Sequence, residues 1–234
     1  LLTTSSTHAI SPHLMKRLAY DARKDFTPIA HLADAPSVLL VTPGLPVKNV
    51  AELMAYAKAH PGQLNYASSG NGTIVHLGTA AFSARAGIEM THVPYKGTAQ
   101  SITDLASGNV QVLLDSLPTG MPHARSGRVR ALAVTGDKRS AFAPELPTLE
   151  QAGVKGYEMT YWFAAYAPAG TPAAEVAKLN ELLHKAARGS ATATFFQPTG
   201  TEVFLNTPDE QRRFQQAESQ KWGRIIKSAG IEPE

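Results

Sequence analysis

The 234-residue sequence contains no cysteine and no long apolar run. Without cysteine, disulfide bonds, thiolate metal ligands and thiol catalysis are excluded, whereas the cellular compartment stays open. A membrane-spanning helix needs about 20 consecutive apolar residues, which the sequence does not offer. The first residues also lack the charged, apolar and small-residue regions of a signal peptide. We therefore expect a globular protein that does not insert into a membrane.

Charged residues are few and spread evenly along the chain. They make up 18% of it, and 22 basic against 19 acidic residues give a formal net charge of +3. No basic run is longer than Arg128-Val-Arg130 or Asp137-Lys138-Arg139, so binding to nucleic acid is not expected. The 8 histidines include no pair spaced for a helical zinc site, and we expect neither a metal nor a cofactor. Hydrophobic residues, at 43%, suffice for one large domain or two smaller ones.

The stretch from Tyr66 to Leu77 predicts a strand, a tight polar turn and a helix in close succession. Its two glycines let the backbone approach a ligand, and the amides at the start of the helix suit an anion. The turn has no Lys or Arg and lacks the glycine patterns of nucleotide-binding loops, so a small carboxylate fits better than a triphosphate. A purely structural turn capped by Thr73 is the alternative and stays open. The candidate ligand residues in this turn are Ser68, Ser69, Gly70, Asn71, Gly72 and Thr73.

Strands and helices alternate through the middle of the chain, which indicates an α/β fold. The alternation predicts parallel strand pairing, with a ligand at the carboxyl ends of the strands. Four strand ends are expected to meet there: Ser68–Thr73, Tyr95–Gly97, Asp115-Ser116 and Thr135-Gly136. A helix is predicted over Pro144–Gly153.

Further strands are predicted over Asp25–Leu32, Ser37–Val41 and Gly156–Tyr166, and prolines bound the first two. The second strand is apolar, so we expect it to be buried on both faces. The chain is expected to cross between two lobes near Ser37–Val41 and Phe163–Ala167, and these crossings are the predicted hinge.

The helix ends carry local signals. Asn49 with Glu52, and Thr207 with Glu210, have the spacing of a capping box, which predicts a helix start at each position. Gly87 is predicted to end the helix that follows the polar turn.

Residues outside the polar turn are also candidates for the ligand site. A second polar loop near the amino terminus contributes Thr4, Ser5, Ser6 and Thr7. Tyr95 and Gly97 follow the next strand along the chain. Asp115 closes an apolar strand, so its carboxylate is held either by a backbone amide or by a ligand group. His76, in the first helical turn, is either a ligand donor or a structural residue.

A set of motifs runs through the chain in order: Asp25-Phe-Thr-Pro28, Thr91-His-Val-Pro-Tyr-Lys-Gly97, Asp104-Leu105, Gly108, Asp115, Arg130–Thr135, Pro147–Gly153 and Lys221-Trp-Gly223. In these motifs the chain resembles the Bug-type extracytoplasmic solute receptors, the substrate-binding components of tripartite tricarboxylate transporters. The resemblance covers essentially the whole chain.

The resemblance implies a two-lobed periplasmic-binding-protein fold, similar to type II, with two hinge crossings and a carboxylate held between the lobes. The implied lobes are residues 1–41 with 166–234, and residues 42–165. Family members usually begin earlier in the sequence, so the first lobe is expected to be incomplete. The implied function is capture of a small carboxylate in the periplasm, without catalysis, and its delivery to the membrane permease subunits.

Two other functions stay open. A ligand-sensing module that signals to a partner protein would share the same pocket. A hydrolase on a similar fold would need Ser68, His76 and Asp115 to act as a triad, and no G-x-S-x-G elbow is present. We therefore predict no catalytic residues.

Overall fold

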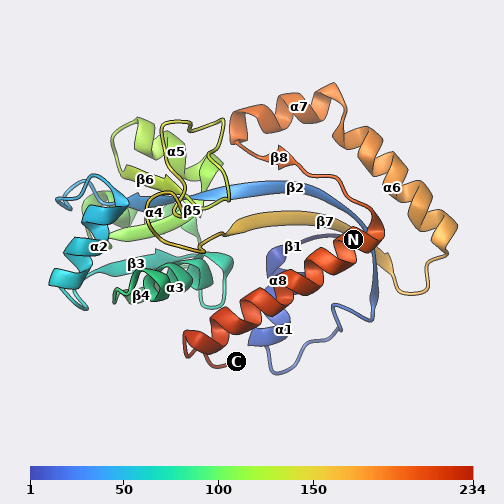
Figure 1. The fold of residues 1–234 in the computed structure, drawn as a ribbon, viewed down its shortest axis with the longest axis horizontal. Coiled ribbons are helices and arrows are strands. Elements are labelled where there is room, and N and C mark those ends of the chain that lie inside the picture. The colour runs from blue at the N-terminus through green and yellow to red at the C-terminus, as the bar shows by residue number, and fades with distance from the viewer. Residues whose placement is uncertain (234) are drawn as a thin grey trace. The chain divides into compact units, whose positions relative to one another are not determined.

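The computed structural model describes residues 1–233 as a mixed α/β protein (Figure 1). The chain folds into two compact units: unit 1 is Leu1–Ala35 with Tyr161–Glu234, and unit 2 is Pro36–Thr160. Strands β2 (Phe26–Val41) and β7 (Thr160–Pro168) carry the chain from one unit to the other. The predicted lobe boundaries lie a few residues further along the same two strands.

Unit 1 contains a small antiparallel sheet and several helices. Strand β1 pairs with β7, and β8 pairs with β2, both antiparallel. Its apolar core includes Ile29, Ala30, Ala165 and Ala167, against which Leu183 of a helix packs. Besides the parts of β2 and β7, the unit consists of β1 (Leu2–Thr4), the π-helix η1 (Ser6–Ile10), α1 (Ser11–Leu14), α6 (Ala173–Ala187), α7 (Ser190–Phe196), the 3-10 helix η2 (Gln197–Thr199), β8 (Glu202–Val203) and α8 (Pro208–Ser228).

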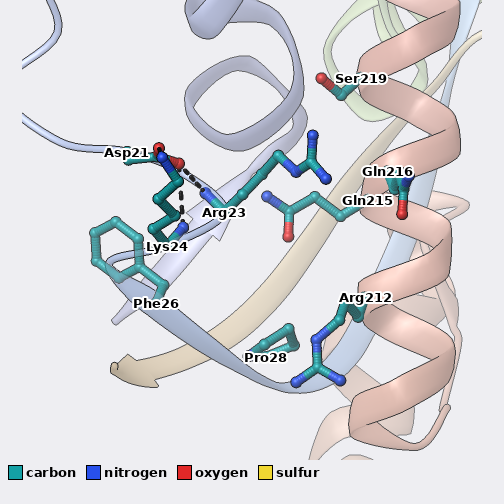
Figure 2. Close-up of a pocket in the computed structure, with 9 residues that line it drawn as sticks. All are labelled: Asp21, Arg23, Lys24, Phe26, Pro28, Arg212, Gln215, Gln216 and Ser219. Atoms are coloured by element: carbon teal, nitrogen blue, oxygen red, sulfur yellow. Dashed lines mark hydrogen bonds and ion pairs between the residues drawn. The ribbon is translucent and has the colours of Figure 1, made fainter. Parts of the chain in front are cut away.

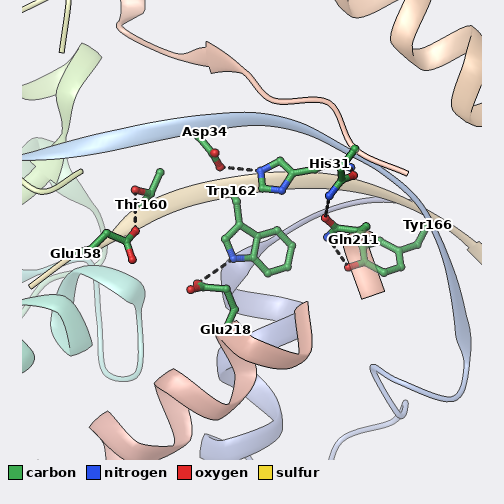
Figure 3. A network of polar contacts seen from close by, with 9 residues as sticks. His31, Asp34, Glu158, Thr160, Trp162, Tyr166, Gln211 and Glu218 are labelled. Carbon is green, nitrogen blue, oxygen red and sulfur yellow. Dashed lines mark hydrogen bonds and ion pairs between the residues drawn. The ribbon is translucent and has the colours of Figure 1, made fainter. Parts of the chain in front are cut away.

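Helix α8 of unit 1 buries a polar face (Figure 3). The carboxylate of Glu218 accepts hydrogen bonds from the indole N–H of Trp162 at 3.2 Å and from that of Trp222 at 3.1 Å. Nearer the N-terminus of α8, the side-chain amide of Gln211 donates to the hydroxyl of Tyr166 at 3.0 Å. Both tryptophans are almost fully buried, so these bonds satisfy donors that water cannot reach.

Unit 2 is a five-stranded sheet with helices. The strand order is β6-β2-β5-β3-β4, in which β2 is antiparallel to β5 and β6, whereas β3 is parallel to β4 and β5. The predicted parallel direction is therefore correct for four strands, and the antiparallel strand between them was not predicted. The remaining elements are α2 (Val50–Ala59), β3 (Asn65–Ser68), α3 (Ile74–Ala86), β4 (Thr91–Pro94), α4 (Thr98–Ser107), β5 (Val112–Ser116), α5 (Leu117–Arg125) and β6 (Arg130–Val134).

The sheet of unit 2 places the carboxyl ends of β3, β4, β5 and β6 at one edge, because these four strands run in the same direction. The last four residues of β2, Val38 to Val41, are fully buried, which confirms the expected burial of the segment Ser37–Val41 on both faces. Ser68 and Pro94 pair at the ends of β3 and β4, so the polar turn after β3 lies beside the segment after β4.

Two of the predictions are wrong. The strands predicted over Asp25–Leu32 and Ser37–Val41 are one strand, β2 (Phe26–Val41), because Pro36 lies where β2 changes its pairing partners and needs no ladder hydrogen bond. The segment Pro144–Gly153 forms turns instead of a helix. Its backbone bonds to the last residue of β6, with the Leu149 amide donating to the Val134 carbonyl at 2.9 Å, and this pairing replaces helical bonds.

Candidate functional site

The polar turn between β3 and α3, residues 68–73, is the first part of the candidate site. Gly70 and Gly72 have φ angles of 128° and 70°, a region that disfavours any residue with a side chain. Thr73 caps α3, because its hydroxyl accepts the amide of His76 at 3.4 Å and donates to the Gly70 carbonyl at 2.8 Å. The predicted cap and turn are therefore present, and Gly87 ends the helix in the left-handed conformation as expected.

The hydroxyl of Ser68 connects the turn to β4 through three hydrogen bonds. It donates to the Gly70 carbonyl at 3.0 Å and accepts the Gly70 amide at 3.1 Å. It also lies 2.6 Å from Nε2 of His92, a residue of β4. The side chain of Ser68 is fully buried, so it shapes the turn from beneath.

Two histidines support the turn from the side. Nδ1 of His76 accepts the amide of Gly72 at 3.1 Å. The rings of His76 and His92 stack with centroids 3.9 Å apart and planes within 7° of parallel. The ring of Tyr66 lies 4.9 Å from that of His92 and 6.3 Å from that of His76, so the three rings form one cluster.

Burial keeps both histidine rings uncharged at neutral pH. It lowers the pKa of His92 to about 4, with the neighbouring His76 contributing, and it also lowers the pKa of His76. The turn itself contains no charged side chain. The groups available to an anion are therefore backbone amides. The amides in the first turn of α3 are the best placed, because the helix provides no carbonyl to accept their hydrogen bonds.

The residues after β4 lie beside the turn. The amide of Tyr95 donates to the Ser68 carbonyl at 3.0 Å, so this segment is fixed to the end of β3. The hydroxyl of Tyr95 donates to Asp104 on α4 at 2.8 Å, and burial together with this carboxylate raises the pKa of Tyr95 to about 12. Gly97 is the N-cap of α4, with a φ angle of 154°.

Asp115 makes local hydrogen bonds at the end of β5. Its carboxylate accepts the amide of Ser116 at 2.8 Å and the hydroxyl of Thr119 at 2.7 Å, and only 2% of the residue is exposed. Burial raises the pKa of Asp115, although both donors oppose this shift. Asp115 therefore has local partners at the strand end, and its predicted contact with a ligand stays a prediction.

The second polar loop, Thr4 to Thr7, belongs to unit 1. Thr4 ends β1, and the hydroxyl of Thr7 donates to the Thr4 carbonyl at 3.1 Å and also contacts the hydroxyl of Thr3. Ser5 is fully buried, and its hydroxyl has no hydrogen-bond partner within the described residues. Because this loop and the turn after β3 lie in different units, their predicted participation in one site stays a prediction.

Sequence reasoning missed His92 and Tyr66. Neither residue stands in the glycine turn, and the motif Thr91–Gly97, which contains His92, does not indicate a contact with Ser68. They face one another because β3 and β4 pair with Tyr66 opposite His92. The available signal was the predicted parallel pairing of the two strands, because residues directly opposite one another on neighbouring strands share a face.

A cavity of about 450 Å³ in unit 1 is the main competitor for the site (Figure 2). Arg23 and Lys24 reach it from the segment before β2, and Arg212 reaches it from α8. Asp21 lies 3.5 Å from the ammonium of Lys24 and partly neutralises its charge. Arg212 forms an ion pair with Asp209, also on α8, at 2.6 Å. Both pairs are largely exposed to solvent, so we rank this cavity below the turn after β3 as an anion site.

Other kinds of site find no support in residues 1–233. Within this part of the chain, no group of three or more histidines and acidic residues has the geometry to hold a metal ion. No helix among the described residues has both the length and the apolar character needed to cross a membrane.

Comparison with solved structures confirms the predicted mixed α/β, two-lobed fold. The structure of Rpa4515 from R. palustris with adipate matches with a TM-score of 0.88 and 38% identity, covering 100% of this chain and 78% of that one. The periplasmic binding protein BugD matches with a TM-score of 0.85 and 29% identity over 100% of this chain and 78% of the other. MatC from Rhodopseudomonas palustris, with bound malate, has a TM-score of 0.82 and 29% identity, covering 96% and 78% of the two chains.

Sequence comparison gives the same family. BugT of Bordetella pertussis is 32% identical over 98% of this chain and 71% of its own length. A UPF0065 protein of Pseudomonas sp. strain P51 is 33% identical over 97% of this chain and 68% of its own length. The model of the tripartite tricarboxylate transporter family receptor matches residues 1–231. The resemblance to Bug-type receptors is confirmed, and the chain belongs to the tripartite tricarboxylate transporter receptor family.

Proposed function

We propose that this protein captures a small carboxylate outside the cytoplasm, in the periplasm, and delivers it to the permease subunits of a tripartite tricarboxylate transporter. The turn Ser68–Thr73 is the proposed contact for a carboxylate group of the ligand. Its companions in the proposed site are His76, Tyr95 and Gly97, together with the loop Thr4 to Thr7 of unit 1. Asp115 is included as a residue that shapes the strand end.

The observation that carries this proposal is the chemistry of the turn. Two glycines in the left-handed region form a tight turn directly before α3, whose first amides have no acceptor within the helix and lie where the helix dipole favours negative charge. A carboxylate is a compact anion that backbone amides can bind without a fixed cation. Two similar structures hold adipate and malate, both dicarboxylates, which supports the same ligand class here.

The geometry around Ser68 argues against hydrolysis. Its hydroxyl contacts a histidine at 2.6 Å, as a nucleophile contacts its base. However, the hydroxyl is fully buried, and the carboxylate of Asp115 bonds to Ser116 and Thr119 rather than to a histidine. Within the described residues, no carboxylate orients the ring of His92. We therefore propose binding without turnover.

Calorimetry on the purified protein tests the proposed function. Adipate and malate are titrated alongside their diamides, which keep the shape of the ligand and lose its charge. We expect heat of binding and a raised melting temperature for at least one acid, and neither effect for its diamide, since a ligand that binds only the native state stabilises it. Equal effects of acid and diamide would contradict the anion site. Recovery of the bound acid unchanged, checked by mass spectrometry, tests the absence of turnover.

The transporter partner needs a separate experiment. Membranes from the native host are solubilised, and the protein is used as bait with and without the acid that binds it. Capture of the permease subunits, identified by mass spectrometry, supports delivery. Capture of a sensor protein in their place would favour the signalling alternative.

A further inference from the structure

The hydroxyl of Ser68 has a fixed number of hydrogen bonds to give and to receive. It carries one hydrogen and two lone pairs. The hydrogen goes to the Gly70 carbonyl at 3.0 Å, and one lone pair takes the Gly70 amide at 3.1 Å. The contact to Nε2 of His92 at 2.6 Å then uses the second lone pair, so Nε2 carries a hydrogen and donates it. In this arrangement every bond of the buried hydroxyl is satisfied.

His76 has the complementary requirement. Its Nδ1 accepts the amide of Gly72 at 3.1 Å, so this nitrogen carries no hydrogen and the ring is neutral. The ring of His92 lies flat against that of His76 with centroids 3.9 Å apart, and Tyr66 lies beside the pair, 4.9 Å from His92 and 6.3 Å from His76. His92 therefore contacts both supports of the turn: Ser68 through its nitrogen, and His76 through the face of its ring.

We propose that His92 is the positioning residue of the carboxylate-binding turn, holding the Gly70 and Gly72 amides in place through Ser68 and His76. This inference rests on the proposed function, because it assigns a role in binding to a residue that does not itself belong to the turn. The Gly70 amide donates to Ser68 and the Gly72 amide donates to His76, so these two side chains fix the orientation of the glycine peptide groups. Loss of the bond from His92 leaves a buried hydroxyl with an empty lone pair and a turn with more freedom.

Three substitutions test the proposal. His92→Phe keeps a ring to stack on His76 and removes Nε2, whereas His92→Gln keeps an amide donor near the position of Nε2 and removes the ring. His60→Phe is the matched control, since His60 also stacks on a tyrosine, at 4.2 Å, and lies before β3 at the end opposite to the turn. Each variant is titrated with adipate and malate, and its melting temperature is measured.

We expect His92→Phe to weaken acid binding about tenfold, the effect of one lost hydrogen bond and the order it imposes. His92→Gln should recover most of this loss, and His60→Phe should bind like the unchanged protein. Recovery by glutamine distinguishes positioning from general packing, because glutamine fills the space of the ring poorly. Unchanged affinity in His92→Phe, or an equal loss in His92→Phe and His92→Gln, would overturn the proposal.

A measurement without ligand separates this inference from the proposed function. Amide hydrogen exchange at Gly70 and Gly72, followed by NMR, should be at least several-fold faster in His92→Phe than in the unchanged protein and in His60→Phe. The double variant Ser68→Ala with His92→Phe should exchange no faster than the more affected single variant, because both remove the same bond. Unchanged exchange, or additive effects, would overturn the role of His92 even if acids bind. If no acid binds while exchange responds as expected, the proposed function fails and the positioning of the turn stands.

Discussion

Replacement of Glu218 by alanine should destabilise unit 1 strongly. In the structure one carboxylate oxygen accepts the indole N–H groups of Trp162 and Trp222, and the other lies 2.5 Å from the ammonium of Lys221. The residue is 8% exposed, so water does not readily replace it. Each buried donor left without an acceptor costs about 1 to 3 kcal/mol, which for two indoles gives a loss of about 4 kcal/mol in the free energy of unfolding.

The assay follows from the same geometry. Trp162 and Trp222 are the 2 tryptophans of the sequence, so intrinsic fluorescence during urea unfolding reports on unit 1 and on this network. Glu218→Gln keeps an oxygen to accept the indoles and loses the charge, so its cost should be about half that of Glu218→Ala. Gln220→Ala, at an exposed position of the same helix, is the control and should change stability by less than about 0.5 kcal/mol. A loss below about 1 kcal/mol in Glu218→Ala would refute the reasoning, because it would mean that the two indoles find other partners.

Two further predictions concern the turn and its histidines. Gly72→Val should abolish binding of adipate and malate while circular dichroism stays near normal, because a branched residue resists the φ angle of 70° and would turn the amide away from His76; retained affinity in calorimetry would count against the turn as the site. Stability should fall between about pH 6.5 and pH 4, since burial lowers the pKa of His8 and of His92 to about 4 and the unfolded chain therefore binds more protons than the native one in this range. Urea unfolding at several pH values measures this slope, which should be shallower in His92→Gln; equal slopes would contradict it.

Local signals in the sequence were sufficient for some elements. Thr73 and Gly87 mark the two ends of α3, and the capping box of Thr207 and Glu210 starts α8, as predicted. These signals work because a cap is made by residues within one turn of the helix end. Prediction failed where a partner outside the segment decides its secondary structure. Pro144–Gly153 forms turns that hydrogen-bond to β6, and not the predicted helix.

The candidate site divides in the same way. The turn Ser68–Thr73 could be predicted because its glycines and its cap stand next to one another in the sequence. His92 could not, since it meets Ser68 only through the register of β3 and β4. The interpretation of Asp115 stayed open because a carboxylate at the end of a strand looks the same in sequence whether Thr119 or a ligand satisfies it.

The neutrality of the proposed site makes its supporting residues as important as its contacts. A lysine in the turn would attract any anion over a range of positions, because a point charge has little directional preference. The amides at the start of α3 attract a carboxylate only when they point toward it, since a hydrogen bond weakens steeply as its angle departs from linear. The path of the turn that precedes them is fixed by the Gly70 and Gly72 amides, which donate to Ser68 and His76, and both of these side chains contact His92. In the proposed receptor, selectivity for one carboxylate over another therefore resides partly in side chains that the ligand does not touch.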